Sequence, residues 1–111
     1  MSEEEERLET DAAIRDLAAR AAALLREEGW CQGDFQREDG SRCLAGAVLD
    51  AKRDIDVIRT SFGLPSRDVR FMLLDRLRRI TGRSLLVAWN DDEDRTAAEV
   101  IAALERAASG G

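Results

Sequence analysis

Apolar residues recur every three or four positions along most of this chain, which is the spacing of one face of an α-helix. The pattern is continuous within four segments: 8–28, 42–59, 66–81 and 96–108. Glycine or proline stands at the breaks between the first three segments, as expected where one helix stops and another begins. We therefore expect an all-α, or nearly all-α, fold in a single compact domain of about four helices.

Residues at the ends of these segments predict how the helices start and stop. Gly29 stands where a left-handed cap would end the first helix, which would place Trp30 over the last turn. Ser41 is the expected N-cap of the second helix, because its hydroxyl can accept from a free backbone N–H. Thr96 and Glu99 have the spacing of a capping box at the start of the last helix.

Two stretches have no assigned helix. Residues 31–42 lack a helical period and contain the turn dipeptide Asp39–Gly40, which predicts a short hairpin-like or irregular element. Residues 84–89 form a short apolar run that fits either a helix or a strand. The domain is expected to span 8–108, after an acidic disordered lead at 1–7 and before a frayed tail at 109–111.

Composition restricts the classes of partner. The 111 residues suffice for one core, with 44% apolar and 36% charged residues. No run approaches the roughly 18 apolar residues of a membrane-spanning helix, so we expect no membrane association. The acidic run Glu3–Glu6 is unlike a secretory signal and predicts a cytoplasmic protein. A net charge of −6 disfavours nucleic acid as a partner.

The residue types present also limit the possible chemistry. The chain has no histidine, which excludes histidine general bases and any Ser–His or Cys–His pair within it. Two cysteines are too few for a structural zinc site. The acidic run 91–94 lacks the spacing of a calcium loop, although one or two carboxylates could hold magnesium. We expect no metal and no cofactor, and we favour a non-enzymatic role over catalysis by carboxylates, Lys52 or cysteine.

Four short motifs follow one another along the chain. They are Gly29-Trp30-x-Gln32-Gly33, Gly40-x-x-Cys43-Leu44-x-Gly46-Ala47, Ala88-Trp89-Asn90-Asp91 and Arg95-Thr96-x-x-Glu99-Val100. In this order they resemble an uncharacterised family of small bacterial and bacteriophage proteins, a domain of unknown function. The resemblance extends from about residue 12 to residue 108. It implies no activity, because none is assigned to that family.

The motifs supply a candidate pocket for a ligand or a partner at one end of the domain. Its residues are Trp30, Gln32, Cys43, Trp89, Asn90 and Asp91. Two indole rings with polar groups between them can enclose a small ligand or a partner's side chain. The alternative is structural: the tryptophans anchor the core at helix ends, while Gln32 and Asn90 satisfy exposed backbone groups.

Cys43 has two interpretations of its own. A thiol near a helix N-terminus can have a lowered pKa and act as a nucleophile or a redox sensor. A buried thiol behaves instead as a small apolar side chain. A disulfide with Cys31 is geometrically conceivable, but a cytoplasmic protein is not expected to keep one.

The third helical segment is a candidate partner surface because six arginines face two aspartates between residues 66 and 83. The candidate residues are Arg70, Phe71, Leu74, Arg76, Arg78, Arg79 and Arg83. An acidic protein, the chain's own acidic lead or nucleic acid would complement these charges. The segment lacks the interleaved aromatic residues on which bases stack. The structural alternative is a solvated face whose cations complement the helix dipole.

These observations favour a protein-interaction or adaptor module of a bacterial or phage cytoplasmic system, with another protein or a second copy as partner. Phe71, Met72 and Leu74 widen the apolar face of the third segment beyond what packing requires. One alternative is a small-molecule binder or an enzyme that uses the end with Trp30 and Trp89. A weaker alternative is nucleic-acid binding through the arginine-rich segment.

Overall fold

The computed structural model describes residues 2–110, and helices account for most of them. The five helices are α1 (Glu3–Glu28), α2 (Leu44–Ser61), α3 (Arg70–Thr81), α4 (Leu86–Asn90) and α5 (Ala97–Ala108). Within the described residues there is no strand, and the stretch 31–42 contributes only isolated bridges to Arg42 from Trp30 and Gln36. The predicted all-α fold is confirmed, with four longer helices and one short one. The apolar run 84–89 contributes to α4.

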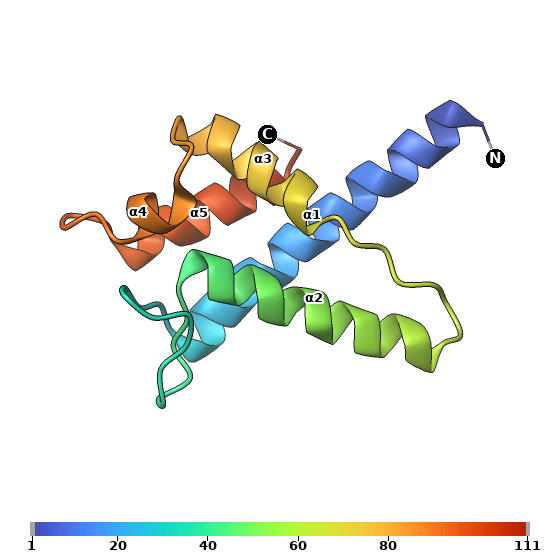
Figure 1. Cartoon of the computed structure of the whole chain (residues 1–111). Helices are drawn as coiled ribbons and strands as arrows, with labels where there is room; N and C mark the ends of the chain where they lie inside the picture. Colours follow the sequence, from blue (N-terminus) through green and yellow to red (C-terminus); the bar gives the residue numbers. More distant parts are fainter. Residues whose placement is uncertain (1, 111) are drawn as a thin grey trace.

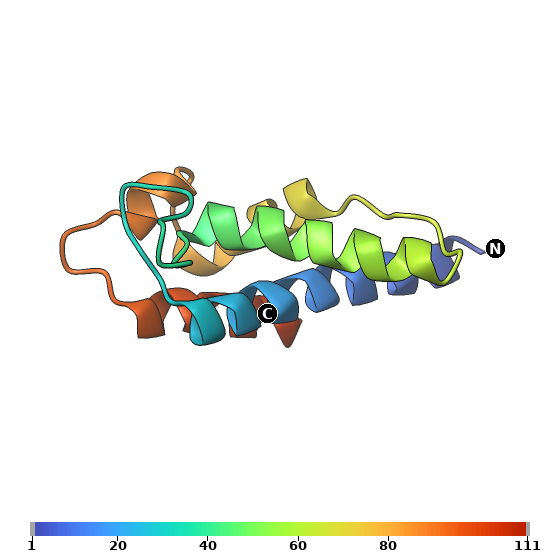
Figure 2. The same cartoon turned by 90° about the horizontal axis from the view of Figure 1, so that it is seen from below.

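The helices form two layers. Figure 2 shows α1 and α5 side by side in one layer, with α2, α3 and α4 in the other. The core lies between the layers, where the largest fully buried side chains are Leu17, Leu44, Leu73, Leu77, Leu104, Val48, Val100 and Asn90. Alanines of α1 such as Ala18 and Ala21 are completely buried, and their small size allows neighbouring helices to approach closely. The face of α2, α3 and α4 that points away from α1 and α5 is turned toward the viewer in Figure 1.

The first helix begins earlier than expected. It starts at Glu3 rather than Leu8, because the Ser2 hydroxyl caps it by accepting from the backbone N–H of Glu5 at 3.2 Å. The glutamates of the first turn also favour the positive end of the helix dipole. The prediction that residues 1–7 form a disordered lead is therefore wrong for Glu3 onward. Met1 and Gly111 lie outside the described residues.

The second helix starts later than expected and uses a different cap. Cys43 is the N-cap, and its Sγ accepts from the backbone N–H of Gly46 at 3.3 Å. Ser41 lies two residues before this cap, and its hydroxyl donates to the Asp39 carboxylate at 2.6 Å. The prediction of Ser41 as the N-cap is therefore wrong, because the helix begins only at Leu44.

The third helix begins at Arg70 and not at Ser66, because Asp68 offers the backbone a competing hydrogen bond. Its carboxylate accepts from the backbone N–H of Arg70 at 3.2 Å and stops the helix from extending backward. At the end of α1, Gly29 has φ 98° and ψ 163°, so the expected left-handed cap is wrong. That backbone conformation is accessible only to glycine, and it leads the chain out of α1 in an extended form.

Candidate functional site

Asn90, at the end of α4, joins three separate segments of the chain. Its side chain is 1% exposed. The Oδ1 atom accepts from the indole Nε1 of Trp30 at 2.7 Å and from the backbone N–H of Leu44 at 3.0 Å. The Nδ2 atom donates to the backbone oxygen of Cys31 at 3.2 Å and to the Asp91 carboxylate at 2.9 Å. We call this arrangement of Asn90 with its four partners the Asn90 junction.

The Asn90 junction leaves no free hydrogen-bonding capacity on the asparagine. An amide side chain has two donor hydrogens and two acceptor lone pairs, and all four are used. Leu44 is the first residue of α2, so its N–H has no partner within the helix and needs this oxygen. All hydrogen-bonding groups of the Asn90 side chain are therefore used within the protein, as expected for a structural role.

Gln32 has the same kind of role beside the Asn90 junction. Its amide donates to the backbone oxygen of Asn90 at 3.0 Å and to that of Asp92 at 2.8 Å. The backbone N–H of Gly33 donates to the Asp91 carboxylate at 3.1 Å. The structure thus brings together four of the candidate pocket residues, Trp30, Gln32, Asn90 and Asp91, and their polar groups bind one another.

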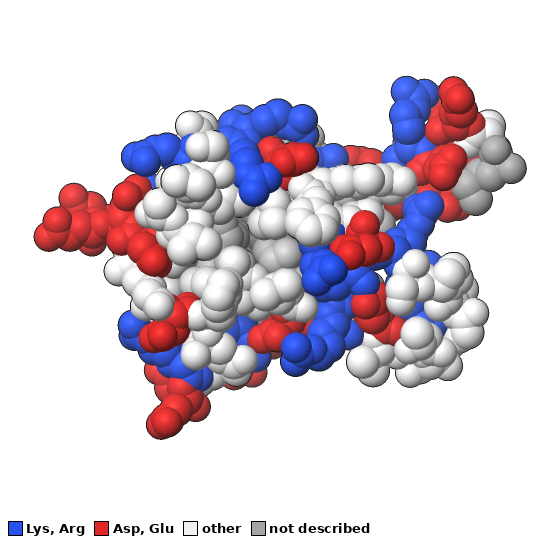
Figure 3. All heavy atoms as spheres, in the orientation of Figure 1, with Lys and Arg blue, Asp and Glu red and all other residues white. Residues whose placement is uncertain are grey.

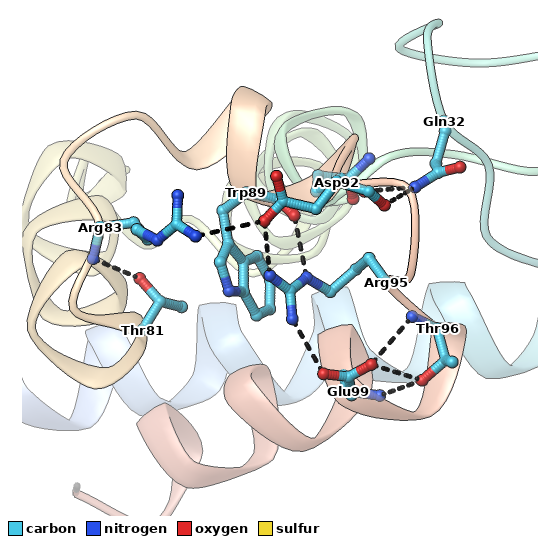
Figure 4. A network of polar contacts seen from close by, with 9 residues as sticks. Gln32, Thr81, Arg83, Trp89, Asp92, Arg95, Thr96 and Glu99 are labelled. Atoms are coloured by element: carbon cyan, nitrogen blue, oxygen red, sulfur yellow. Dashed lines mark hydrogen bonds and ion pairs between the residues drawn. The ribbon is translucent and has the colours of Figure 1, made fainter.

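Trp89 lies beneath Arg95, which links α4 to the start of α5 (Figure 4). The guanidinium carbon stands 4.2 Å from the ring centroid of Trp89, a cation–π distance. The guanidinium nitrogens of Arg95 donate to the Trp89 backbone oxygen at 2.9 Å and to the carboxylates of Asp92 and Glu99, both at 2.8 Å. Glu99 also completes the capping box with Thr96, which confirms that prediction.

Cys43 is buried, and its pKa is raised by that burial although hydrogen bonds from Gly46 and Ala45 oppose the effect. Cys31 is buried as well, and both thiols are free. Cys43 and Asp91 line a hollow of about 170 Å³ together with Gly33, Asp34, Phe35 and Val87. The two tryptophans, Gln32 and Asn90 are outside the lining of this hollow, so the predicted residues do not surround one common space.

The arginines of the predicted partner surface are largely engaged within the chain. Arg76 donates to the Asp11 carboxylate at 2.8 Å and thereby ties α3 to α1. The other ion pairs of this segment are Arg67–Glu9, Arg70–Asp68, Arg78–Asp75 and Arg83–Asp92. The hydrogen bond from Arg70 lowers the pKa of Asp68 to about 2. Arg79 is exposed, and across residues 2–110 no ion pair involves it.

Sequence reasoning missed the α2 wall of an apolar groove on the outer face, although it named three residues of the α3 wall. Ala45, Val48 and Leu49 of α2 and Arg70, Phe71 and Leu74 of α3 line a hollow of about 230 Å³ whose walls are mostly apolar. Figure 3 shows an uncharged area over this face, bordered by charged side chains. The available signal was Leu49 and Val57, apolar residues that lie outside the buried stripe of their segment.

This hollow continues along α2 toward the helix end. There it meets one of about 460 Å³ with Leu49 and Arg70 in common, lined also by Lys52, Arg53, Asp56, Val57 and Thr60. The hollow of Cys43, Phe35 and Val87 at the helix start shares no lining residue with either. We call the two hollows that share Leu49 and Arg70 the outer groove.

The structure explains why the second motif has a glycine at position 46. A Cβ atom there would lie 2.0 Å from the backbone oxygen of Phe35, far inside van der Waals contact. The same oxygen accepts from the backbone N–H of Cys43 at 3.3 Å. The missing side chain therefore lets the 31–42 loop rest directly on the first turn of α2.

Two features are absent from the residues that the structure describes. Between residues 2 and 110, no group of three histidine, cysteine or acidic side chains is placed to hold a metal ion. No helix in that same range combines the length and the apolar character required to cross a membrane.

Fold and site together define a small two-layer helical protein organised around a buried asparagine. The chain belongs to the Family of unknown function (DUF6197), whose pattern matches residues 9–110. This match confirms the resemblance to an uncharacterised domain family that the motifs indicated. No curated protein and no solved structure gives a match to the chain.

Proposed function

We propose that this protein is a non-enzymatic interaction module that binds a protein partner in the outer groove. One observation carries the proposal: among residues 2–110, three of the eleven exposed large apolar side chains line this groove. They are Leu49, Val57 and Phe71, exposed by 44%, 61% and 73%. Contiguous exposed apolar surface bordered by charge is typical of a protein-binding site. We place this role in the cytoplasm of a bacterium or in a bacteriophage system.

The groove offers enough apolar surface to drive binding. Fully burying a side chain such as Phe71 contributes roughly 1.5–3 kcal/mol relative to leaving it in water. Val48 is buried and forms the floor, while Leu49 and Phe71 project beside it. A partner with apolar residues on one face of a helix fits such a surface, because helix-in-groove recognition buries residues at helical spacing.

A small ligand in the hollow of Cys43 is the second candidate. Asp34 and Asp91 would favour a positively charged group there. The space of about 170 Å³ is below the roughly 300–1,000 Å³ of common small-molecule sites, which favours the protein partner. Nucleic acid is a weaker candidate, because five of the six arginines between residues 66 and 83 are in ion pairs.

Selection from a displayed library of helical peptides tests the proposed function. The protein is used below any concentration at which sedimentation detects association, so that a partner copy cannot occupy the groove. We expect enriched peptides with apolar residues at positions i, i+3 or i+4, and i+7. Their binding should shift the NMR methyl signals of Leu49, Val57 and Leu74.

The variants Leu49→Asp and Leu8→Asp make a matched pair for this test. Both side chains are exposed, and Leu8 lies on α1 outside the groove. Leu49→Asp should abolish peptide binding, whereas Leu8→Asp should bind like the original chain. Absence of enriched peptides, or binding that Leu49→Asp leaves unchanged, would refute the proposed function. A thermal-shift screen of metabolites and metals, with melting raised by a specific compound, would favour the second candidate.

A further inference from the structure

We propose that Cys31 and Cys43 form a reversible disulfide on exposure to a hydroperoxide, which fixes the two ends of the 31–42 loop to each other. This inference assigns a modification site and does not depend on the proposed function. Its basis is the backbone register that brings the two residues side by side. Both thiols are buried and free in this structure.

Two backbone hydrogen bonds define that register. The N–H of Arg42 donates to the oxygen of Gly29, and the N–H of Cys31 donates to the oxygen of Arg42, both at 3.0 Å. They form a parallel bridge between Trp30 and Arg42. The next pair in the same register is Cys31 and Cys43. Because successive side chains point to opposite faces of an extended chain, the two cysteines share the face opposite to Trp30 and Arg42.

The two segments separate only after the cysteine pair. The backbone of Cys43 is extended, with φ −79° and ψ 175°, so the register continues to this residue. Beyond it, the Asn90 amide lies between the segments. Its Nδ2 donates to the Cys31 oxygen at 3.2 Å, and its Oδ1 accepts from the Leu44 N–H at 3.0 Å.

This placement matches the geometry of a disulfide. Neighbouring extended segments lie about 4.8 Å apart, and a disulfide joins residues whose Cα atoms are about 4.4–6.8 Å apart with Cβ atoms on the same side. Burial raises the pKa of Cys43, and the nearby Cys31 thiol adds to this rise. The bond would remove one weak contact, from the Cys31 thiol to the Asp34 oxygen at 3.5 Å.

Cys43 is the thiol that the oxidant reaches first. It lines the hollow of about 170 Å³ at the start of α2, and Cys31 is not among the lining residues. Hydrogen peroxide is close to water in size, and about 10–15 Å³ of such space holds one water molecule. The raised pKa leaves little thiolate on Cys43 at neutral pH, so the first step is slow.

The reaction takes two steps and one molecule of hydrogen peroxide. The Cys43 thiolate attacks a peroxide oxygen, so that an S–O bond forms, the O–O bond breaks, and the leaving hydroxide takes up the thiol proton as water. The Cys31 sulfur then attacks the sulfenic acid of Cys43. An S–S bond forms, the S–O bond breaks, and hydroxide leaves with the Cys31 proton as water. The thiol pair loses two electrons and two protons, and the peroxide becomes two waters.

Incubation of the native chain with hydrogen peroxide, followed by denaturation and alkylation, tests the disulfide by peptide mapping. We expect Cys31 and Cys43 in one linked peptide pair within a monomer, and dithiothreitol should restore both thiols by exchange. Oxidation of Met72, which is 49% exposed, is located separately by the oxygen that it adds. Thiols that stay free, or disulfides between chains, would overturn the proposal.

Single variants test the order of the two thiols. Cys31→Ser should give a sulfenic acid on Cys43 that dimedone traps. Cys43→Ser should leave Cys31 unmodified, and serine retains a side chain that can cap α2. Dimedone labelling of Cys31 in the second variant would overturn the assigned order.

Equilibration in glutathione buffers shows whether the fold itself favours the bond. At half oxidation, the ratio of squared glutathione concentration to glutathione disulfide should be at least about tenfold higher for the native chain than for the chain in denaturing urea. The oxidised chain should accordingly unfold at a higher urea concentration than the reduced chain. A native ratio equal to or below the unfolded one would overturn the proposal, because the fold would then hold the thiols apart.

Discussion

Replacing Asn90 by aspartate tests whether the Asn90 junction holds the fold together. Asn90→Asp changes one NH₂ group into oxygen and leaves the shape of the side chain unaltered. The oxygen that accepts from Trp30 and Leu44 is retained. The new oxygen would face two acceptors, the Cys31 carbonyl and the Asp91 carboxylate, in place of two hydrogen bonds. The substitution therefore separates the donor role of Asn90 from its acceptor role.

The expected loss at pH 7 is about 3–5 kcal/mol in the free energy of unfolding, the usual cost of an uncompensated buried charge. Burial and the nearby Asp91 would raise the pKa of the introduced carboxyl in the folded state above its value in the unfolded chain. The folded state then binds more protons, so stability rises as pH falls. Once protonated, the carboxyl can donate to Cys31 again. The deficit relative to the original chain should shrink between pH 7 and pH 5.

Urea unfolding followed by far-UV circular dichroism measures both effects. The control is Gln36→Glu, the same change from amide to carboxylate at an exposed position whose side chain makes no hydrogen bond within the described residues. The control should stay within about 0.5 kcal/mol of the original chain. If Asn90→Asp unfolds at the original urea midpoint, or its deficit is the same at both pH values, the assigned role of Asn90 is wrong.

Three further predictions concern other parts of the structure. Gly46→Ala should destabilise the protein by about 1–3 kcal/mol in urea unfolding, although alanine favours helices, because the 31–42 loop must move away; an unchanged midpoint would contradict the close approach. Cys31 and Cys43 should react with a thiol reagent only after denaturation, and a rapid native reaction of either would contradict their burial. Arg70→Gln should raise the pKa of Asp68 from about 2 toward 3.8 in an NMR titration, and an unchanged pKa would show that another group lowers it.

Some elements of the fold could be predicted because their causes are local. The capping box of Thr96 and Glu99 depends on two side chains three residues apart, and it formed as expected. The apolar stripe of 42–59 likewise predicted the buried face of α2 as far as Ala51, whereas Ile58 near the helix end is 57% exposed. The cap at the start of α2 could not be assigned in this way. The helix begins at Leu44, whose backbone N–H donates to Asn90, 46 residues further along the chain, and no local pattern shows that contact.

The candidate site was predictable in part for the same reason. The motifs indicated that Trp30 and Asn90 belong to one end of the domain, and the two side chains are in direct contact. Sequence alone could not show that every hydrogen-bonding group of the Asn90 side chain has a partner within the protein, because most of these partners lie far away along the chain. The outer groove depends on how α2 and α3 lie beside each other, and no local pattern in either segment encodes that relation.

The Asn90 junction also has a consequence for the order of folding. Its contacts to Trp30, Cys31 and Leu44 close loops of 60, 59 and 46 residues. Contacts between residues so distant in sequence carry a large entropy of loop closure and tend to form late. We expect α1 and α2 to pair in the folding transition state, before α4 docks. Substitution of Asn90 should then give a φ-value near zero, with its effect confined to the unfolding rate. The contacts of Asn90 would then slow unfolding and leave the rate of folding unchanged.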